Sequence, residues 1–227
     1  MPIVCLSAGH GGSDPGAIGK TGVQEKVVNL AVALRVAAIL RPVVDVVMTR
    51  ETDVDVSLEE RAELANSSDC SCFTEIHCNA SVFRDANGTE TFYHPVSVVG
   101  RRLAQCIQSR MVKALGTRDR GIKESPNLAV LRLTNCPAAL VEIAFISNAK
   151  EEAMLTDPKV HALAAQAIAE GIAEAMGFKL PTPWDPVIEI GKLKTDGLID
   201  SGHAPKDAVT WGELATILNR IRRANSV

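Results

Sequence analysis

The stretch Ile3-Val4-Cys5-Leu6-Ser7-Ala8-Gly9-His10-Gly11-Gly12 opens the chain with an apolar run that leads into a histidine flanked by glycines. Because its apolar residues do not alternate with polar ones, the run predicts a strand buried on both faces, as in a parallel sheet. Similar runs lie at residues 43–48, 70–76 and 138–144. Helical patterns separate them, at residues 27–38, after Ser57, around 103–115 and from Asp157-Pro158 to Gly177. This alternation predicts an α/β fold with an open, mostly parallel twisted sheet flanked by helices, and ligands at the carboxyl ends of the strands.

One clear boundary divides the chain, the proline-rich segment Leu180-Pro181-Thr182-Pro183-Trp184. We therefore predict a domain over residues 1–178, a linker over 179–184 and a small helical C-terminal unit over 185–227. Within that unit, one helix is expected over 185–197 and a second is expected to begin at a capping box formed by Thr210 and Glu213. Two short helices make a marginal core by themselves, so the unit is expected to dock on the first domain or on a partner chain.

The composition excludes several classes of protein. Of the 227 residues, 46% are hydrophobic and 22% charged, which is ordinary for a globular protein in water. No apolar run approaches the length of a membrane span, so no membrane insertion is expected. The net charge of −3 and the 4% aromatic content offer neither a basic surface nor stacking platforms. Nucleic acid is therefore not an expected partner.

Cysteine usage and the first residues bear on the cellular compartment. None of the six cysteines stands in CxxC spacing, which favours buried thiols in a reducing compartment over a disulfide framework. The first strand begins almost at once, with no basic region, apolar core and cleavage site before it. We therefore expect a protein made in the cytoplasm without a secretory signal.

Four polar residues stand out against the apolar runs. His10 and His77 each end such a run, and Glu25 lies on the helix that follows the first. Imidazole and carboxylate are ligands that Zn²⁺ accepts, and three of them leave a fourth position for a water that the metal acidifies. Glu142 interrupts the last run, and since an unpaired buried carboxylate is costly, it is expected to emerge at a strand end beside that water. The four residues suggest a hydrolase with one zinc ion.

Six segments together resemble one family, the zinc-dependent N-acetylmuramoyl-L-alanine amidases of the amidase-3 type. The resemblance covers roughly residues 2–177, with the segments in the right order. They are Gly9-His10-Gly11-Gly12-x-Asp14-x-Gly16-Ala17, Glu25-Lys26-x-x-Asn29-Leu30, Thr49-Arg50-x-x-Asp53, Leu58-x-x-Arg61-x-x-x-Ala65-Asn66, His77-x-Asn79-Ala80 and Val141-Glu142-Ile143-Ala144-Phe145-Ile146-Ser147-Asn148.

The resemblance implies a role for each matching residue. His10, Glu25 and His77 would bind zinc, and Glu142 would be the catalytic carboxylate. Asn79 and Ala80 would lie beside the substrate groove. The substrate would be peptidoglycan, cut at the amide between N-acetylmuramic acid and L-alanine of the stem peptide. Without a signal, such an enzyme would act on the cell wall after release, as phage endolysins do, or lyse a mother cell.

The sequence departs from the family at three places near these motifs. Ser7-Ala8-Gly9 stands where the family more often has Asp-Pro-Gly, which removes no ligand. Glu75 stands where a small residue is usual, on the same strand face as His77. We expect Glu75 to support the ligands, so that its removal changes metal affinity or pH dependence. Cys78 is expected to turn away from the metal by strand alternation.

Other interpretations remain open at this stage. The chain could be a wall-binding module that keeps the amidase fold without turnover, or a zinc peptidase acting on the stem peptide. Gly19-Lys20-Thr21 follows a glycine-rich turn as a phosphate loop does, but Asp14 occupies the position where such a loop needs its first glycine. Nucleotide binding is therefore not expected. Arg50 and Arg61 are expected to anchor loops through carbonyl or carboxylate groups rather than to touch substrate.

Two expectations concern the surroundings of the site. Only about 20 residues separate Arg118 from Ala138, too few for the long inhibitory insertion of some family members, so the groove is expected to be open. The C-terminal unit loosely resembles a single surface-layer-homology repeat in residues 197–200 and 210–215. It is expected to bind cell wall or to mediate self-association into a homo-oligomer.

Overall fold

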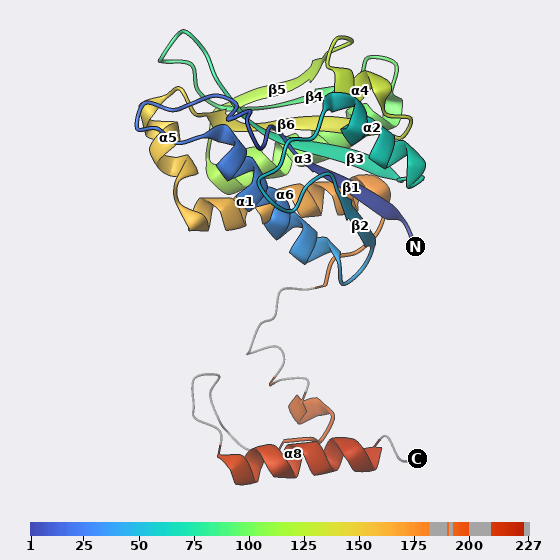
Figure 1. Cartoon of the computed structure of the whole chain (residues 1–227). Helices are drawn as coiled ribbons and strands as arrows, with labels where there is room; N and C mark the ends of the chain where they lie inside the picture. The colour runs from blue at the N-terminus through green and yellow to red at the C-terminus, as the bar shows by residue number, and fades with distance from the viewer. Residues whose placement is uncertain (182–189, 191–192, 200–209, 225–227) are drawn as a thin grey trace. The chain divides into compact units, whose positions relative to one another are not determined.

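The computed structural model describes residues 1–181, 190, 193–199 and 210–224 (Figure 1). The chain folds into two compact units, Met1–Leu180 and Pro181–Val227.

The first unit is built on a sheet whose described strands run in the order β2-β1-β3-β6-β4-β5. The strands are β1 (Ile3–Ala8), β2 (Asp45–Met48), β3 (Cys72–Asn79), β4 (Thr89–Tyr93), β5 (Asp119–Glu124) and β6 (Ala138–Phe145). β2, β1, β3 and β6 are mutually parallel, β4 pairs with β6 in the antiparallel sense, and β5 is parallel to β4. The predicted open, mostly parallel sheet is confirmed.

Helices of very different extent cover the two faces of the sheet. α1 (Glu25–Leu40), α3 (Val98–Leu115) and α6 (Pro158–Met176) pack on one face and form the main core with alternate strand residues such as Leu6, Ile76 and Val141. α2 (Leu58–Ser67) and α4 (Ala129–Leu133) pack on the other face in a smaller cluster with Cys5, Phe73 and Leu140. These contacts reach only the first halves of β3 and β6.

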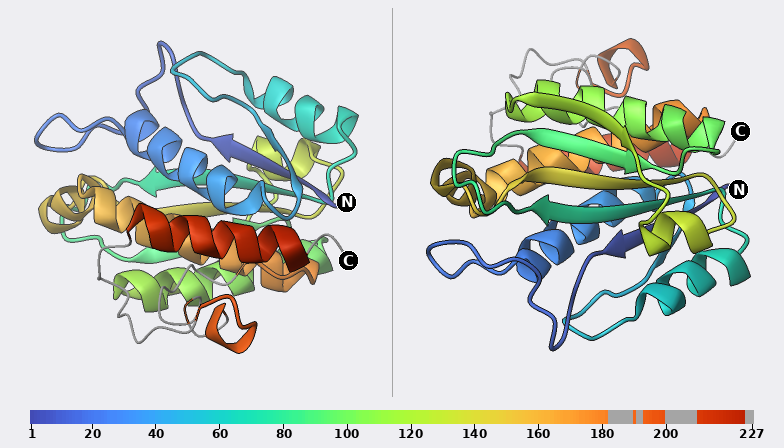
Figure 2. Two further views of the ribbon diagram at one scale, coloured as in Figure 1. Left: turned by 90° about the horizontal axis from the view of Figure 1, so that it is seen from below. Right: turned by 90° about the horizontal axis from the view of Figure 1, so that it is seen from above.

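Among the described helices of the first unit, none therefore packs on this second face toward the carboxyl ends of β3 and β6. In the right-hand view of Figure 2, β3, β6 and β4 lie in front of α1, α3 and α6, while α2 and α4 lie over one end of the sheet only. Residues two apart share a strand face. Glu142 therefore shares the open face with Leu140, and His77 shares it with Phe73.

Local signals account for the predicted helix ends. Ser57 and Glu60 form the reciprocal capping box that begins α2. The Asp157 carboxylate caps α6, Pro158 occupies its first turn, and Gly177 ends it in a left-handed conformation at φ 78°. Both helices begin as expected, and α6 also ends at Gly177 as expected.

Four elements of the first unit lie outside the predicted runs and helices: β4, β5, α4 and α5 (Ala149–Leu155). β5 reads Asp-Arg-Gly-Ile-Lys-Glu and has Gly121 at φ 77°, beside an irregularity in its register with β4. A charged edge strand with a bulge carries no apolar run, so the pattern that found the other strands could not find it.

In the second unit the structure describes α8 (Trp211–Ala224) and a helical turn at residues 193–195. The predicted helix start at Asp185 and the Glu213 side chain of the predicted capping box lie outside the described residues. Within the described ranges, no helix combines the length and the apolar character that crossing a membrane requires.

Candidate metal centre

Three side chains from separate elements meet at the carboxyl ends of β1 and β3. His10 lies two residues after β1, Glu25 is the first residue of α1, and His77 lies near the end of β3. One ligand atom from each lies within 4.8 Å of the others. The structure thus brings together the three residues that the sequence predicted as ligands.

Glu25 is the buried centre of this group, with only 3% of its surface exposed. Its Oε1 accepts from His77 Nδ1 at 2.8 Å and from the Cys78 N–H at 3.0 Å, and its Oε2 accepts from the Ala17 N–H at 2.9 Å. Burial by itself would raise the pKa of Glu25, but hydrogen bonds with His10 and His77 outweigh it and hold the pKa well below its usual range. Glu25 is therefore a carboxylate at neutral pH.

His10 is held so that one ring nitrogen faces Glu25. Its Nδ1 lies 2.6 Å from Asp14 Oδ2, and its Nε2 lies 3.2 Å from Glu25 Oε2. The backbone at His10 has φ 60°, a conformation that is rare outside glycine, and Arg61 holds it by donating to the His10 carbonyl at 2.9 Å. Asp14 thus occupies Nδ1 and leaves Nε2 for a metal, the arrangement that metal-binding histidines usually show.

His77 presents the opposite nitrogen to the same point. Its Nδ1 contacts Glu25, while its Nε2 lies 3.7 Å from Glu75 Oε1. Glu75 is 1% exposed and accepts from Ser7 Oγ and from Arg61 Nη1, each at 3.1 Å. Glu75 therefore lies behind His77, on the same strand face as expected, at a longer distance than the 2.6 Å that joins Asp14 to His10.

Gly9 is required for this packing. A Cβ at Gly9 would lie 2.3 Å from His77 Nε2 and Cε1, closer than such atoms ever approach. Only glycine lets the chain after β1 pass beside the imidazole.

The donor set fits Zn²⁺. Two imidazole nitrogens and one carboxylate oxygen converge, each histidine has an acidic partner at its other nitrogen, and Glu25 is already ionised. The Cys78 side chain belongs to the helix-covered core and is 2% exposed, so it turns away from this point as expected.

Glu142 lies beside His77 on the open face of the sheet. The two residues are direct partners in the register of β3 and β6. Burial raises the pKa of Glu142 to about 7, and its Oε2 has no hydrogen-bond partner among the described residues. The expectation that Glu142 emerges at a strand end is wrong: it lies three residues before the end of β6, partly exposed, where no described helix of the first unit packs on the sheet.

A further carboxylate, Glu90 of β4, continues this row. It pairs with Glu142 in the antiparallel register. Asn79 Nδ2 donates to Glu90 Oε1 at 2.7 Å, and Arg120 Nε and Lys123 Nζ donate to Oε2, each at 2.6 Å. Asn79 is the last residue of β3 and Ala80, which follows it, is exposed; their place beside a substrate groove stays a prediction.

Sequence reasoning missed Asp14 as a partner of His10, and it missed Glu90, Arg120 and Lys123 entirely. The alternation Thr89-Glu90-Thr91-Phe92-Tyr93 was the available signal, since it puts Glu90 and Phe92 on one face of a strand.

Two arginines anchor the chain around the centre. Arg50 donates to the carbonyls of Ala8 and Gly9 at 2.9 and 3.0 Å. Arg61 donates to the Ala8 carbonyl at 2.7 Å as well as to His10 and Glu75. Both are 3% exposed, and both fix loops through carbonyl or carboxylate groups as predicted.

The segment that resembles a phosphate loop is occupied by the protein itself. The N–H groups of Lys20 and Thr21 donate to the Glu152 carboxylate at 3.0 and 2.7 Å, and Thr21 Oγ1 donates to it at 2.7 Å. A carboxylate sits where a phosphate would need those donors, in agreement with the expectation that no nucleotide binds.

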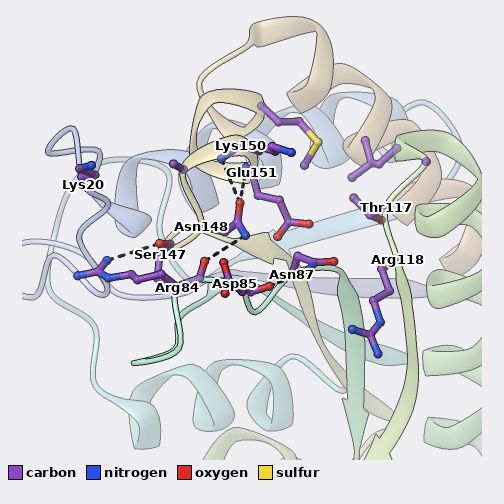
Figure 3. Close-up of a pocket in the computed structure, with 14 residues that line it drawn as sticks. Lys20, Arg84, Asp85, Asn87, Thr117, Arg118, Ser147, Asn148, Lys150 and Glu151 are labelled. Atoms are coloured by element: carbon purple, nitrogen blue, oxygen red, sulfur yellow. Dashed lines mark hydrogen bonds between the residues drawn. The ribbon is translucent and has the colours of Figure 1, made fainter.

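Two hollows in the surface bear on the site. A hollow of about 310 Å³ lies beside His10 and is lined by acidic groups that include Asp14, Asp55 and Glu60. A larger one of about 950 Å³ lies over α5 and the loop at residues 84–87 (Figure 3). Asn148 lies centrally there, and its side chain caps α5 and donates to the Arg84 carbonyl. No predicted site residue lines the larger hollow, so it is separate from the metal centre.

Comparisons with known proteins agree on one family. The family model described as N-acetylmuramoyl-L-alanine amidase matches residues 4–174. The chain is 39% identical over 171 residues to the N-acetylmuramoyl-L-alanine amidase LytC of Bacillus subtilis (strain 168), across 74% of this chain and 34% of LytC. It is 38% identical over 186 residues to the endolysin of Bacillus phage SPP1, across 78% of this chain and 67% of the endolysin.

A solved structure gives the same result. The catalytic domain of CwlV, an N-acetylmuramoyl-L-alanine amidase from Bacillus (Paenibacillus) polymyxa var. colistinus, matches with a TM-score of 0.76 at 40% identity. The match covers 79% of this chain and 100% of that domain. The resemblance found in the six sequence segments is confirmed.

Proposed function

This chain belongs to the N-acetylmuramoyl-L-alanine amidases, a family of peptidoglycan hydrolases, and we propose that it cuts its substrate with a zinc ion held by His10, Glu25 and His77. The bond cleaved joins the lactyl carbonyl of N-acetylmuramic acid to the nitrogen of L-alanine. The two imidazoles and the ionised Glu25 supply the charge and geometry that such an ion needs. When bound, the ion polarises the scissile carbonyl and acidifies the attacking water.

Glu142 moves the proton in this reaction. Its carboxylate accepts a proton from the attacking water and returns it to the L-alanine nitrogen, because an amine leaves poorly as an anion. A general base works best with a pKa near the working pH, and burial gives Glu142 a pKa of about 7.

One observation supports this assignment above the others: Glu142 stands in register with His77 on the uncovered face, with one carboxylate oxygen unpartnered among the described residues. An unpaired buried oxygen lowers the stability of the fold, and a purely structural role for Glu142 would not offset that loss. A non-catalytic wall-binding module would need neither Glu142 nor the convergence of the three ligands.

End-group analysis of digested peptidoglycan tests the proposal. New L-alanine amino termini formed by the zinc-loaded protein would support amidase activity. New termini at another residue would make the protein a peptidase of the stem peptide. Wall binding without new termini would identify a non-catalytic module.

The Pro181–Val227 unit carries a separate proposal, that it binds cell wall or holds two copies together. α8 exposes Leu214 and Leu218, which lie one helical turn apart and make an apolar stripe. Truncation after Pro181 should weaken pelleting with purified wall or halve the mass measured by light scattering. Unchanged pelleting and unchanged mass per particle would reject both roles.

A further inference from the structure

Two cations lie on the open face of the sheet, on the far side of Glu142 from the metal ligands. Glu142 pairs with Glu90 across β6 and β4, and Phe92 of β4 pairs with Lys123 of β5. Arg120 and Lys123 both reach back over β4 to Glu90. The row His77, Glu142, Glu90 thus ends in a positive cluster on β5.

Glu90 fixes the cluster without neutralising it. Its carboxylate accepts from Arg120 Nε and Lys123 Nζ, and its other oxygen is held by Asn79. Two cations share one carboxylate, which leaves one excess positive charge beside the catalytic residue. No other ion pair of Arg120 or Lys123 occurs in the described part of the chain.

Aromatic rings beneath the cations restrict them further. The Arg120 guanidinium lies 4.8 Å from the centre of the Phe145 ring, and Lys123 Nζ lies 6.0 Å from that of Phe92. The side chains of Arg120 and Lys123 are still 26% and 38% exposed. They are therefore positioned in advance and open to an anion from solvent.

The spacing matches the substrate of the proposed reaction. β5 lies two strands from β6, about 10 Å away at the usual strand separation. A peptide advances about 3.5 Å per residue, and a hydrogen bond adds about 3 Å. A peptide that begins at the scissile nitrogen therefore spans this distance when a carboxylate on its second residue accepts a hydrogen bond from Lys123. Lys123 uses one of its three N–H donors on Glu90, which leaves donors for such a group.

We propose that Lys123 and Arg120, held by Glu90, form a subsite for the free carboxylate of the stem-peptide residue that follows L-alanine. This inference rests on the proposed function, because it places the scissile amide at Glu142. It makes the protein selective for stem peptides whose second residue carries a carboxylate rather than a carboxamide.

Binding measurements separate this inference from turnover. The parent protein is zinc-loaded Glu142→Gln, and calorimetry gives its affinity for two ligands whose γ-carboxyl is blocked as the methylamide. They are N-acetylmuramoyl-L-alanyl-D-glutamic acid and the D-isoglutamine analogue, in which a carboxamide replaces the α-carboxylate. We expect the acid to bind about tenfold more tightly, as one charge-assisted hydrogen bond provides. Adding Lys123→Gln should make the two affinities equal, and Lys123→Arg should retain the preference.

Lys113→Gln is the matched control, since Lys113 is an exposed lysine on α3 and should leave the preference intact. Thermal unfolding midpoints establish that each variant is folded. Three results would overturn the subsite. They are equal affinities in the parent, no measurable binding of either ligand, and a preference that survives both Lys123→Gln and Arg120→Gln. Wild-type protein that cleaves neither compound would instead overturn the proposed function, while a carboxylate preference in binding would still support the subsite.

Discussion

His77 and Glu142 are register partners on β3 and β6, so a predicted metal ligand and a predicted proton carrier stand side by side on a part of the sheet that the described helices of the first unit leave uncovered. His77 contacts the buried Glu25 through its Nδ1, whereas Glu142 keeps one carboxylate oxygen without a partner among the described residues. This contrast separates metal binding from proton transfer and makes the two functions separable by mutation.

Asp14→Asn should weaken zinc binding by about tenfold to a hundredfold, because the carboxylate that orients His10 through Nδ1 is lost. Competition with a chromogenic chelator measures the affinity. Asp85→Asn, an exposed position away from the ligands, is the control. An affinity equal to that of wild type would show that Asp14 does not orient the ligand.

Glu75→Ser should lower both stability and zinc affinity. Arg61 would be left as a buried cation without its carboxylate, a change that costs about 3–5 kcal/mol in comparable buried pairs, and His77 would lose the acidic group behind its Nε2. Denaturant unfolding and zinc titration check the two effects. Wild-type zinc affinity and rate in Glu75→Ser would refute a supporting role.

Gly9→Ala should abolish zinc binding, because the added methyl group would displace the His77 ring. Gly22→Ala is the control: its Cβ meets nothing within 4 Å, although φ is +91°, so it should cost only about 1 kcal/mol of stability. Zinc content after dialysis separates the two. Full occupancy in Gly9→Ala would contradict the geometry described for His77.

The zinc-free protein should lose stability as the pH rises. Although burial opposes both shifts, contacts with Glu25 raise the pKa of His10 and, more strongly, that of His77. A raised folded-state pKa contributes stability that is complete below the unfolded value of about 6.5 and is lost as the pH rises through the folded value. The lowered pKa of Glu25 acts in the other direction, with a contribution present above about 4.5 and lost in acid.

Thermal unfolding in the presence of a chelator should therefore show a stability maximum between about pH 4.5 and 6.5 from this group. Glu25→Gln should flatten the decline above pH 6.5, because the histidines lose their anionic partner. A zinc-free wild type that is equally stable at pH 6 and pH 9 would contradict the pairing.

Sequence patterns predicted those parts of the molecule in which burial dictates the residues. Strands such as β1 and β3 are apolar runs because both faces are covered over much of their length. The metal ligands His10 and His77 could be found because they lie where these apolar runs end. The charged strand β5 could not be found this way, since Arg120 and Lys123 lie on an edge strand and an open face. The accessibility of the Glu142 side chain depends on where α2 and α4 stop covering the sheet, which is a property of the tertiary structure. Asp14 lies in a loop without periodicity, so its bond to His10 had no pattern to reveal it.

The most direct test of the account measures zinc per chain and the rate of L-alanine end-group formation together, in wild type, Glu142→Gln and Glu25→Gln. We predict that Glu142→Gln keeps one zinc per chain and its unfolding midpoint while its rate falls by a factor of about 10² to 10⁴, whereas Glu25→Gln loses zinc and activity together. A Glu142→Gln protein that cleaves at the wild-type rate, or that loses its zinc, would contradict the separation of metal binding from proton transfer.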